Sequence, residues 1–156
     1  MLEIIIPYYK LTFFEKTLQS LENQTDKRFK VFIGDDAGSE NPAILINKFK
    51  GKFNFEYHRF EKNLGRVSLV HQWNRCIDLS KGLGWILILG DDDVLEENVV
   101  EKLYENFEEI NNLDINVVRF ATQKINDMGE KTSEKYYHPK IENSVDFFFR
   151  PSRSSL

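Results

Sequence analysis

Short apolar runs alternate with amphipathic segments along most of the chain. The runs have the length of β-strands and lie at residues 2–7, 29–34 and 85–89, and residues 53–59 alternate enough to predict a further strand. Between and after them, apolar residues recur at helical spacing over about 12–24, 42–49, 66–80 and 96–110. Strands that alternate with helices predict an α/β fold, in which a mainly parallel sheet is covered by helices on both faces.

The pattern also predicts details of individual elements. Thr12, with Glu15 three residues later, is typical of a capping box at the start of the first helix. Val67, Val70, Trp73 and Ile77 share one face of the third helix, and we expect that face to be buried. The run at 85–89 contains no polar residue, so we expect a strand that is buried on both faces.

The rhythm changes after residue 112. Residues 115–122 are predicted to form one more strand, and a polar loop is expected at 123–131. An apolar stretch at 145–149 then needs a surface on which to pack. We therefore expect a single domain over residues 1–156, with part of its C-terminal region missing from this sequence.

The composition narrows the class of protein. The net charge is −4, which does not favour a nucleic-acid partner. Cys76 is the single cysteine, so it cannot form an intramolecular disulfide, and the Cys/His spacing of zinc sites does not occur. The N-terminus lacks signal-peptide features, and no apolar run approaches the roughly 20 residues that cross a bilayer. We expect a cytoplasmic protein, either free or peripheral at the inner face of the membrane.

Acidic residues directly follow two of the predicted strands. Three consecutive aspartates, 91–93, come after Gly90 at the end of the fourth strand, and Asp35 with Asp36 ends the second. Because the carboxyl ends of parallel strands share one edge of the sheet, we expect the two clusters to lie close together. Adjacent carboxylates repel each other and must be solvated, hydrogen-bonded or neutralised by a cation. Oxygen ligands suit a hard ion such as Mg²⁺ or Mn²⁺.

Motifs exclude several kinds of phosphate or metal site. Neither GxGxxG nor GxxxxGK[ST] occurs, which argues against a dinucleotide-binding Rossmann site and a P-loop. An EF-hand at 91–97 lacks the required glycine and spacing. A phosphoacceptor (receiver-like) domain would need an acid after the first strand, where Tyr8 and Tyr9 stand. Three uses of the aspartates stay open: capping turns, holding a metal, and accepting hydrogen bonds from a ribose or a base.

Five segments resemble family 2 glycosyltransferases of the GT-A fold. They are residues 4–9, 18–25, 32–39, 63–65 together with 73–77, and 88–93. They occur in the family's order and spacing, and the resemblance covers about residues 2–110. It implies a Rossmann-like GT-A fold and a bacterial protein of the cell-surface polysaccharide type.

The resemblance also implies an activity. A sugar would be transferred, with inversion and with the help of Mn²⁺ or Mg²⁺, from a nucleotide diphosphate donor to a saccharide or lipid-linked acceptor. A UDP-sugar is the expected donor. On this interpretation, residues 1–112 form the half that binds the donor, and residues 113–156 begin an incomplete acceptor half.

The family's nucleotide-binding positions fall on nine residues: Pro7, Tyr8, Tyr9, Asp35, Asp36, Asn63, Gly65, Arg66 and Asp91. Tyr8 or Tyr9 would pack on the base, and Asp35 or Asp36 would accept a hydrogen bond from it. Arg66 would pair with a phosphate. Asp91 would contact the ribose.

The family's metal positions fall on Asp92 and Asp93. Asp92 would be the direct ligand, and Asp93 a second ligand or a support for it. The family often has an aspartate where Gly90 stands, so here Asp91 and Asp92 would have to serve. The metal would neutralise the diphosphate and the charge that grows on the leaving group.

The general base that an inverting transferase needs has no candidate in the pattern. The family supplies it from a carboxylate in the second half of the protein. The late acids do not match that pattern; they are Asp127, Glu130, Glu134, Glu142 and Asp146. The alternative to a glycosyltransferase is therefore a module that binds a nucleotide sugar without catalysis, or an inactive fragment.

Overall fold

The structure is a computed structural model that describes residues 1–82 and 84–148. Its contacts divide the chain into two compact units, Met1–Asp114 and a second one that begins at Ile115. None of the helices in the described residues is long and apolar enough to cross a membrane.

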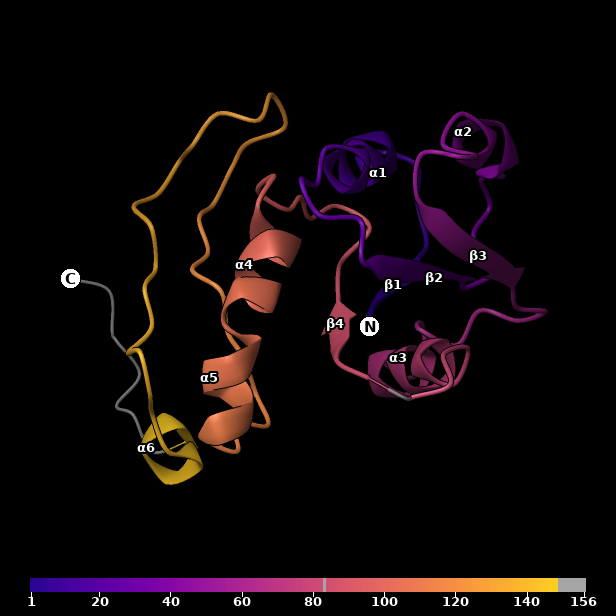
Figure 1. The fold of residues 1–156 in the computed structure, drawn as a ribbon. Helices are drawn as coiled ribbons and strands as arrows, with labels where there is room; N and C mark the ends of the chain where they lie inside the picture. The colour runs from indigo at the N-terminus through magenta and orange to yellow at the C-terminus, as the bar shows by residue number, and fades with distance from the viewer. Residues whose placement is uncertain (83, 149–156) are drawn as a thin grey trace. The chain divides into compact units, whose positions relative to one another are not determined.

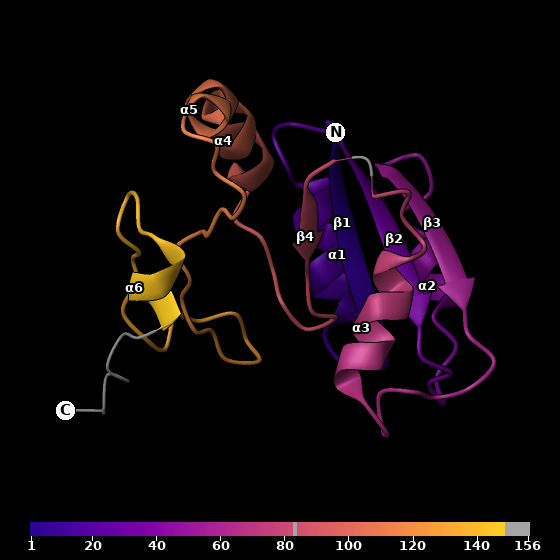
Figure 2. The same cartoon turned by 90° about the horizontal axis from the view of Figure 1, so that it is seen from below.

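The first unit contains four strands and five helices among the described residues. In chain order they are β1 (Leu2–Tyr8), α1 (Phe14–Glu22), β2 (Phe29–Asp35), α2 (Ala43–Asn47), β3 (Asn54–Arg59), α3 (Leu69–Ile77), β4 (Ile86–Ile88), α4 (Val99–Glu105) and α5 (Phe107–Asn112). The strands form a parallel sheet in the order β3-β2-β1-β4. Helices α1 and α2 lie on one face of the sheet and α3 lies on the other (Figures 1 and 2). The predicted α/β fold, with helices on both faces, is confirmed.

The strand register brings the ends of the strands together. Tyr8 at the end of β1 pairs with Asp35 at the end of β2, and Asp35 pairs with Arg59 at the end of β3. Strand β4 pairs with β1 through Ile88 and Ile5, and the Leu89 N–H then donates to the Ile5 carbonyl at 2.9 Å. The segments that follow the strands therefore start from one edge of the sheet, as predicted.

The core lies between the sheet and its helices. β1 and β2 are buried almost throughout, and α1 contributes Phe14, Leu18 and Leu21. Each large apolar side chain removed from water stabilises the fold by about 2 kcal/mol. On the other face of the sheet, α3 buries Cys76 against β2, and burial raises the pKa of its thiol to about 12.

Helix α1 begins later than the capping pattern predicted. Its first residue is Phe14 and its N-cap is Phe13, with no hydrogen bond from a side chain at the cap. The prediction of Thr12 as the N-cap was therefore wrong. The preceding turn is held instead by backbone hydrogen bonds, such as the one from the Phe14 N–H to the Leu11 carbonyl at 3.1 Å.

Two expectations about buried faces were also wrong. Ile86 and Ile88 of β4 are more than a third exposed, because β4 is the edge strand of the sheet and pairs only with β1 among the described residues. Helix α3 turns Gln72 and Cys76 to the sheet, whereas Val67, Val70 and Trp73 stay exposed. A buried polar side chain is tolerated there because the Gln72 amide donates to the Gly34 carbonyl at 3.3 Å. Of the predicted face, Ile77 is partly buried and packs against the core cluster of Ile5, Phe32 and Cys76.

The last helical region of the first unit is divided. One helix was expected over about 96–110, but α4 ends at Glu105 and α5 begins at Phe107. Asn106, between them, is the C-cap of one helix and the N-cap of the other. Its side-chain amide donates to the Lys102 carbonyl at 2.7 Å.

The second unit has little regular structure in its described part. The strand predicted at 115–122 does not form; Thr122 makes only an isolated bridge to Tyr136. A short helix, α6 (Ser144–Phe148), closes the described part. Arg119 pairs with Glu142 and lies over the Phe147 ring at 4.5 Å from the ring centroid. Residue 149, the last of the expected apolar stretch, and residues 150–156 lie outside the described residues.

We predict that Gly34 tolerates no side chain. A Cβ atom at this position would lie 2.4 Å from the Cys76 sulfur and 3.1 Å from the Phe60 ring. Gly34→Ala should therefore lower the free energy of unfolding by about 2 kcal/mol, measured by urea denaturation. In the double variant Gly34→Ala/Cys76→Ala the sulfur is gone, and the cost of Gly34→Ala should fall. Additive costs of the two changes would contradict this packing account.

Candidate functional site

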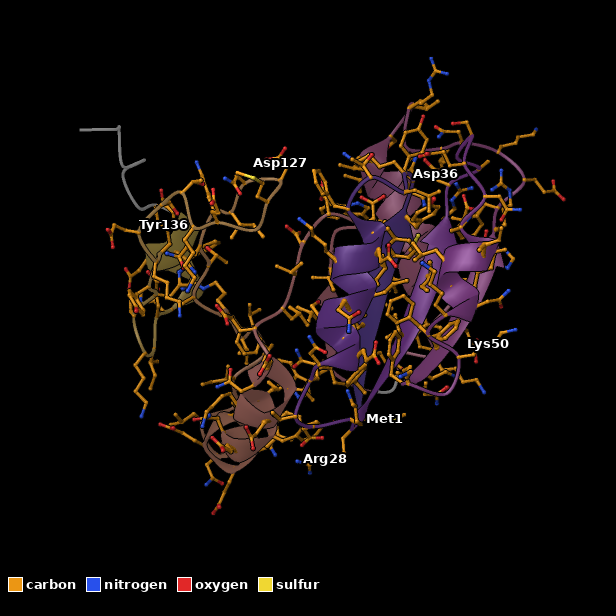
Figure 3. All side chains as sticks on the ribbon, turned by 90° about the horizontal axis from the view of Figure 1, so that it is seen from above. Met1, Arg28, Asp36, Lys50, Asp127 and Tyr136 are labelled. Atoms are coloured by element: carbon orange, nitrogen blue, oxygen red, sulfur yellow. The ribbon has the colours of Figure 1, made fainter. Side chains whose placement is uncertain are left out.

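A pocket of about 280 Å³ opens at the carboxyl edge of the sheet in the first unit. Its walls are Pro7, Tyr8, Tyr9, Asp36, Asn63, Gly65, Arg66, Leu69, Gln72 and Trp73. Figure 3 shows Asp36 at the end of the sheet opposite to Met1. Seven of the nine residues predicted to bind a nucleotide line this pocket; Asp35 and Asp91 do not. The structure thus gathers residues from three separate stretches of the sequence around one cavity.

Asp36 holds one wall of the pocket in place. Its buried carboxylate accepts hydrogen bonds from the N–H groups of Leu64 at 2.7 Å and Gly65 at 2.9 Å, and it pairs with the Arg75 guanidinium. A Cβ atom at residue 65 would lie 2.6 Å from the Asp36 Oδ2 atom, so only glycine lets the loop approach this closely. Asn63 adds a turn by accepting from the Arg66 N–H at 3.0 Å.

Arg75, on α3, is enclosed by its contacts. Its guanidinium lies 3.9 Å from the centroid of the Phe60 ring and donates to the Lys62 carbonyl at 2.9 Å. Its Nε–H donates to the Gln72 side-chain oxygen at 2.5 Å. Arg75 therefore links α3, the loop that precedes Asn63, and the buried carboxylate of Asp36.

Asp35 is buried behind the pocket. Its carboxylate accepts hydrogen bonds from the Tyr57 hydroxyl at 2.6 Å and the Gly38 N–H at 3.1 Å, and it pairs with Arg59 at 2.7 Å. Burial, with the hydrogen bond to Asp35, raises the pKa of Tyr57 to about 12. Of the two aspartates proposed to contact a base, Asp36 is thus the one at the pocket, and Asp35 ties β2 to β3.

Asp91 anchors the loop that follows β1. Its carboxylate accepts from the N–H groups of Tyr9 at 2.7 Å and Lys10 at 3.0 Å. Burial raises the pKa of Asp91 above its ordinary value, while the two N–H groups act in the opposite direction. Through Tyr9, Asp91 joins the turn that carries Asp91, Asp92 and Asp93, the acidic turn, to the wall of the pocket.

Asp92 and Asp93 are exposed, in contrast to Asp35, Asp36 and Asp91. Both carboxylates approach Gly90: a Cβ atom at that residue would lie 3.2 Å from the Asp92 Oδ1 atom and 2.7 Å from the Asp93 Oδ2 atom. An aspartate in place of Gly90 would collide with them. Lys10 pairs with Asp92 at 3.4 Å, and because both side chains are half exposed this pair contributes less than about 1 kcal/mol.

The donor set of this turn fits a hard divalent cation. Magnesium is commonly held by one or two carboxylates together with substrate phosphates, rather than by a complete cage of protein ligands. The carboxylates of Asp92 and Asp93, which both lie beside Gly90, meet that requirement. No group of three or more His, Cys, Asp or Glu residues placed to hold a metal occurs in the described residues. Any metal here would therefore need further ligands from a bound molecule or from water.

The aromatic side chains of the pocket differ in what they can contact. Tyr8 is fully buried against Phe14, with ring centroids 4.5 Å apart, and its hydroxyl has no hydrogen-bond partner among the described residues. Tyr9 is 50% exposed and Trp73 is 39% exposed. Tyr9 and Trp73, rather than Tyr8, can thus offer a ring to a planar ligand.

Sequence reasoning missed four residues of the site. Trp73 was assigned to the core, and Leu69, Gln72 and Arg75 were not considered. Leu69 and Trp73 are four residues apart on α3, so their shared face was visible in the periodicity, but the side on which it lies was not. Arg75 stands in the segment 73–77 that resembles the family, but no role was predicted for it, because a basic residue on a helix is usually solvated.

The chain is similar in sequence to known glycosyltransferases. A profile of the family described as Glycosyl transferase family 2 matches residues 3–154. The chain is 31% identical over 112 residues to poly(ribitol-phosphate) beta-N-acetylglucosaminyltransferase TarP of Staphylococcus aureus (strain N315), a match that covers 69% of the chain and 32% of TarP. It is 23% identical over 110 residues to glycosyltransferase GlyG of Streptococcus pneumoniae serotype 4 (strain ATCC BAA-334 / TIGR4), covering 70% of the chain and 36% of GlyG. The chain thus spans about a third of the length of these relatives.

Solved structures share the fold. Residues 1–349 of S. aureus TarS in complex with UDP-GlcNAc superpose with a TM-score of 0.62 at 20% sequence identity, covering 70% of this chain and 32% of that one. The complex of the same protein with UDP also has a TM-score of 0.62, at 21% identity, with the same coverage of both chains. The fold of the first unit is therefore the GT-A glycosyltransferase fold.

We predict that Arg75 stabilises the site far more than a neighbouring arginine does. Removing one partner of a buried ion pair leaves an uncompensated charge, so Arg75→Met should lower the free energy of unfolding by about 3 kcal/mol. Arg66→Met, at an exposed position of the same pocket, should cost less than about 0.5 kcal/mol. Urea denaturation of both variants measures the difference. Equal costs would show that Asp36 does not depend on its arginine.

Proposed function

The chain belongs to glycosyl transferase family 2, and from that membership we propose that its first unit binds a nucleotide diphosphate sugar. The sugar is then transferred, with inversion, to a saccharide or lipid-linked acceptor. One observation supports the proposal: a pocket with exposed aromatic walls lies at the carboxyl edge of the sheet, and the Tyr9 N–H in its wall donates to Asp91 of the acidic turn. The pocket thus suits a nucleoside, and the acidic turn suits the metal-bound diphosphate.

The base of the nucleotide is proposed to lie against Tyr9 and Trp73, whose exposed rings both line the pocket. A carboxylate offers about four acceptor positions, and Asp36 uses three of them for protein donors. The remaining position can accept one N–H from the base. Uracil has one such group on its ring, which supports UDP as the nucleotide. The complexes of the similar TarS protein with UDP and UDP-GlcNAc agree with this choice.

The diphosphate is proposed to lie beside the acidic turn. Asp92 would hold a divalent cation directly and Asp93 would be its second ligand or support. When bound, Mn²⁺ or Mg²⁺ neutralises the diphosphate and stabilises the negative charge that develops on the leaving group. Arg66, exposed at the pocket, adds a positive charge for a phosphate. Asp91, which orders the backbone of Tyr9 and Lys10, remains the proposed contact to the ribose.

The second candidate is a module that binds a nucleotide sugar without transferring it. The observation that favours it is the state of the pocket carboxylate: Asp36 is committed to Arg75 and two backbone N–H groups, and it is the single acid among the pocket's described residues. An acceptor hydroxyl needs a free carboxylate as its base. Binding of UDP-GlcNAc without formation of UDP, in the presence of candidate acceptors, would support this candidate over the enzyme.

We predict that Tyr9 and Trp73 contribute to nucleotide binding without any metal. Stacking of a base on an aromatic ring is worth about 1–3 kcal/mol, so Tyr9→Ala and Trp73→Ala should each weaken UDP binding about 10-fold in calorimetry without divalent ions. Tyr137→Ala, at an exposed tyrosine of the second unit, is the control and should change nothing. If UDP bound equally well to both pocket variants, the base would have to lie elsewhere.

We further predict that Asp92→Asn abolishes the metal-dependent part of UDP binding. The substitution keeps the shape of an exposed side chain, so the melting temperature should stay the same. Loss of a direct ligand should lower Mn²⁺ affinity by at least about 100-fold, measured by titration with UDP present. Asp78→Asn, an exposed aspartate at the end of α3, is the matched control. Unchanged affinity for the Mn²⁺–UDP complex would refute the assignment of Asp92.

A further inference from the structure

Helix α1 carries polar side chains on its buried face, where apolar residues are expected. Thr17 and Ser20 lie in the helix and Gln24 lies just beyond its end, so they follow one another at intervals of three and four residues. All three are buried, next to the apolar Leu18 and Leu21. A buried hydroxyl or amide costs free energy unless it is hydrogen-bonded. The hydrogen-bond partners of these three side chains therefore indicate what the side chains stabilise.

Ser20 and Gln24 each make one hydrogen bond within this region, to the carbonyls of Thr17 and Ser20. All three side chains also bond to the segment that starts with the acidic turn. The Thr17 hydroxyl donates to the Asp91 carbonyl at 3.1 Å, and the Ser20 hydroxyl accepts from the Leu95 N–H at 3.1 Å. The Gln24 side chain donates to the Glu96 carbonyl at 2.8 Å and accepts from the Val100 N–H at 3.1 Å. The order of the bonds along α1 matches the order of their partners along the chain.

This segment depends on outside support for its position. β4 ends at Ile88 and α4 begins at Val99, and the residues between them, all of which the structure describes, form neither strand nor helix. Asp92 and Asp93 lie between two of the anchored residues, Asp91 and Leu95. Their carboxylates repel each other, so the backbone that carries them would tend to move if it were free.

We propose that Thr17 and Ser20 are positioning residues that hold Asp92 and Asp93 in place for a metal–diphosphate complex, with Gln24 extending the row to the start of α4. This inference rests on the proposed function. Metal ligands must be held to within about 0.5 Å of their productive positions by supporting hydrogen bonds. The buried polar row of α1 supplies that support from the side of the sheet that carries α1, away from the pocket wall formed by α3.

The decisive pair of variants is Thr17→Val and Thr17→Ser. Valine keeps the shape of threonine but removes the hydroxyl, whereas serine keeps the hydroxyl. Thr17→Val should lower Mn²⁺ affinity about 10-fold in the presence of UDP, measured by the electron paramagnetic resonance of free Mn²⁺. Thr17→Ser should retain the wild-type Mn²⁺ affinity. Neither change should alter UDP affinity measured without metal, because Thr17 does not line the pocket.

Ser20→Ala provides an independent second variant if Thr17→Val fails to fold. It should lower Mn²⁺ affinity in the same way and should speed hydrogen exchange at the Leu95 N–H. A merely structural role gives a different result: the melting temperature falls, while Mn²⁺ affinity is unchanged or falls together with metal-free UDP affinity. Either form of that result would overturn the proposal.

Asp92→Asn, measured alongside, distinguishes a wrong metal assignment from a wrong positioning role. If Asp92→Asn loses Mn²⁺ affinity while Thr17→Val and Ser20→Ala keep it, the metal assignment holds and the positioning role is refuted. If Asp92→Asn keeps Mn²⁺ affinity, the proposed metal ligand itself is wrong, and the positioning proposal falls with it. Loss in Asp92→Asn, Thr17→Val and Ser20→Ala, with retention in Thr17→Ser, is the outcome expected.

Discussion

Buried carboxylates at the carboxyl edge of the sheet determine the conformation of the loops around them. A buried anion must be surrounded by donors, because its desolvation is otherwise too costly. Asp35 draws Tyr57 and Arg59 of β3 to itself, and Asp36 draws the backbone of the loop at 64–65 together with Arg75. Asp91 does the same for the backbone after β1. The loops that wall the pocket are therefore folded around charges, and the pocket is the space that remains between them.

The acidic residues consequently divide into two kinds. Asp35, Asp36 and Asp91 are buried and bonded to the protein, so they shape the site. Asp92 and Asp93 are exposed and both lie beside Gly90, so a cation can reach them. Thr17 and Ser20 of α1 bond to the backbone on either side of Asp92 and Asp93, whereas Arg75 of α3 pairs with Asp36 from the other face of the sheet (Figures 1 and 2). The two helices thus act as supports for different ends of one proposed nucleotide site.

Much of the fold could be predicted from the sequence because its signals are local. The period of apolar residues distinguishes strands from helices, and alternation of the two requires parallel strands joined by crossovers. The predictions failed where burial of a residue depends on which other element packs against it. The face of α3 that is buried contains Gln72 and Cys76, because Gly34 lets the helix approach there. The apolar run of β4 is exposed at Ile86 and Ile88, because edge position depends on which strands pair and not on composition.

For the site, the sequence by itself determined which residues stand at the ends of the strands, and hence that tyrosines and aspartates meet at one edge. That much follows from strand length and parallel register, which are properties of the chain. Only the tertiary structure decided the partner of each carboxylate. Arg75 is 39 residues from Asp36, and Thr17 is 74 residues from Asp91, so no local pattern connects them. Burial then distinguishes the two kinds of aspartate. A buried carboxylate must be hydrogen-bonded by the protein, whereas an exposed one can bind a cation.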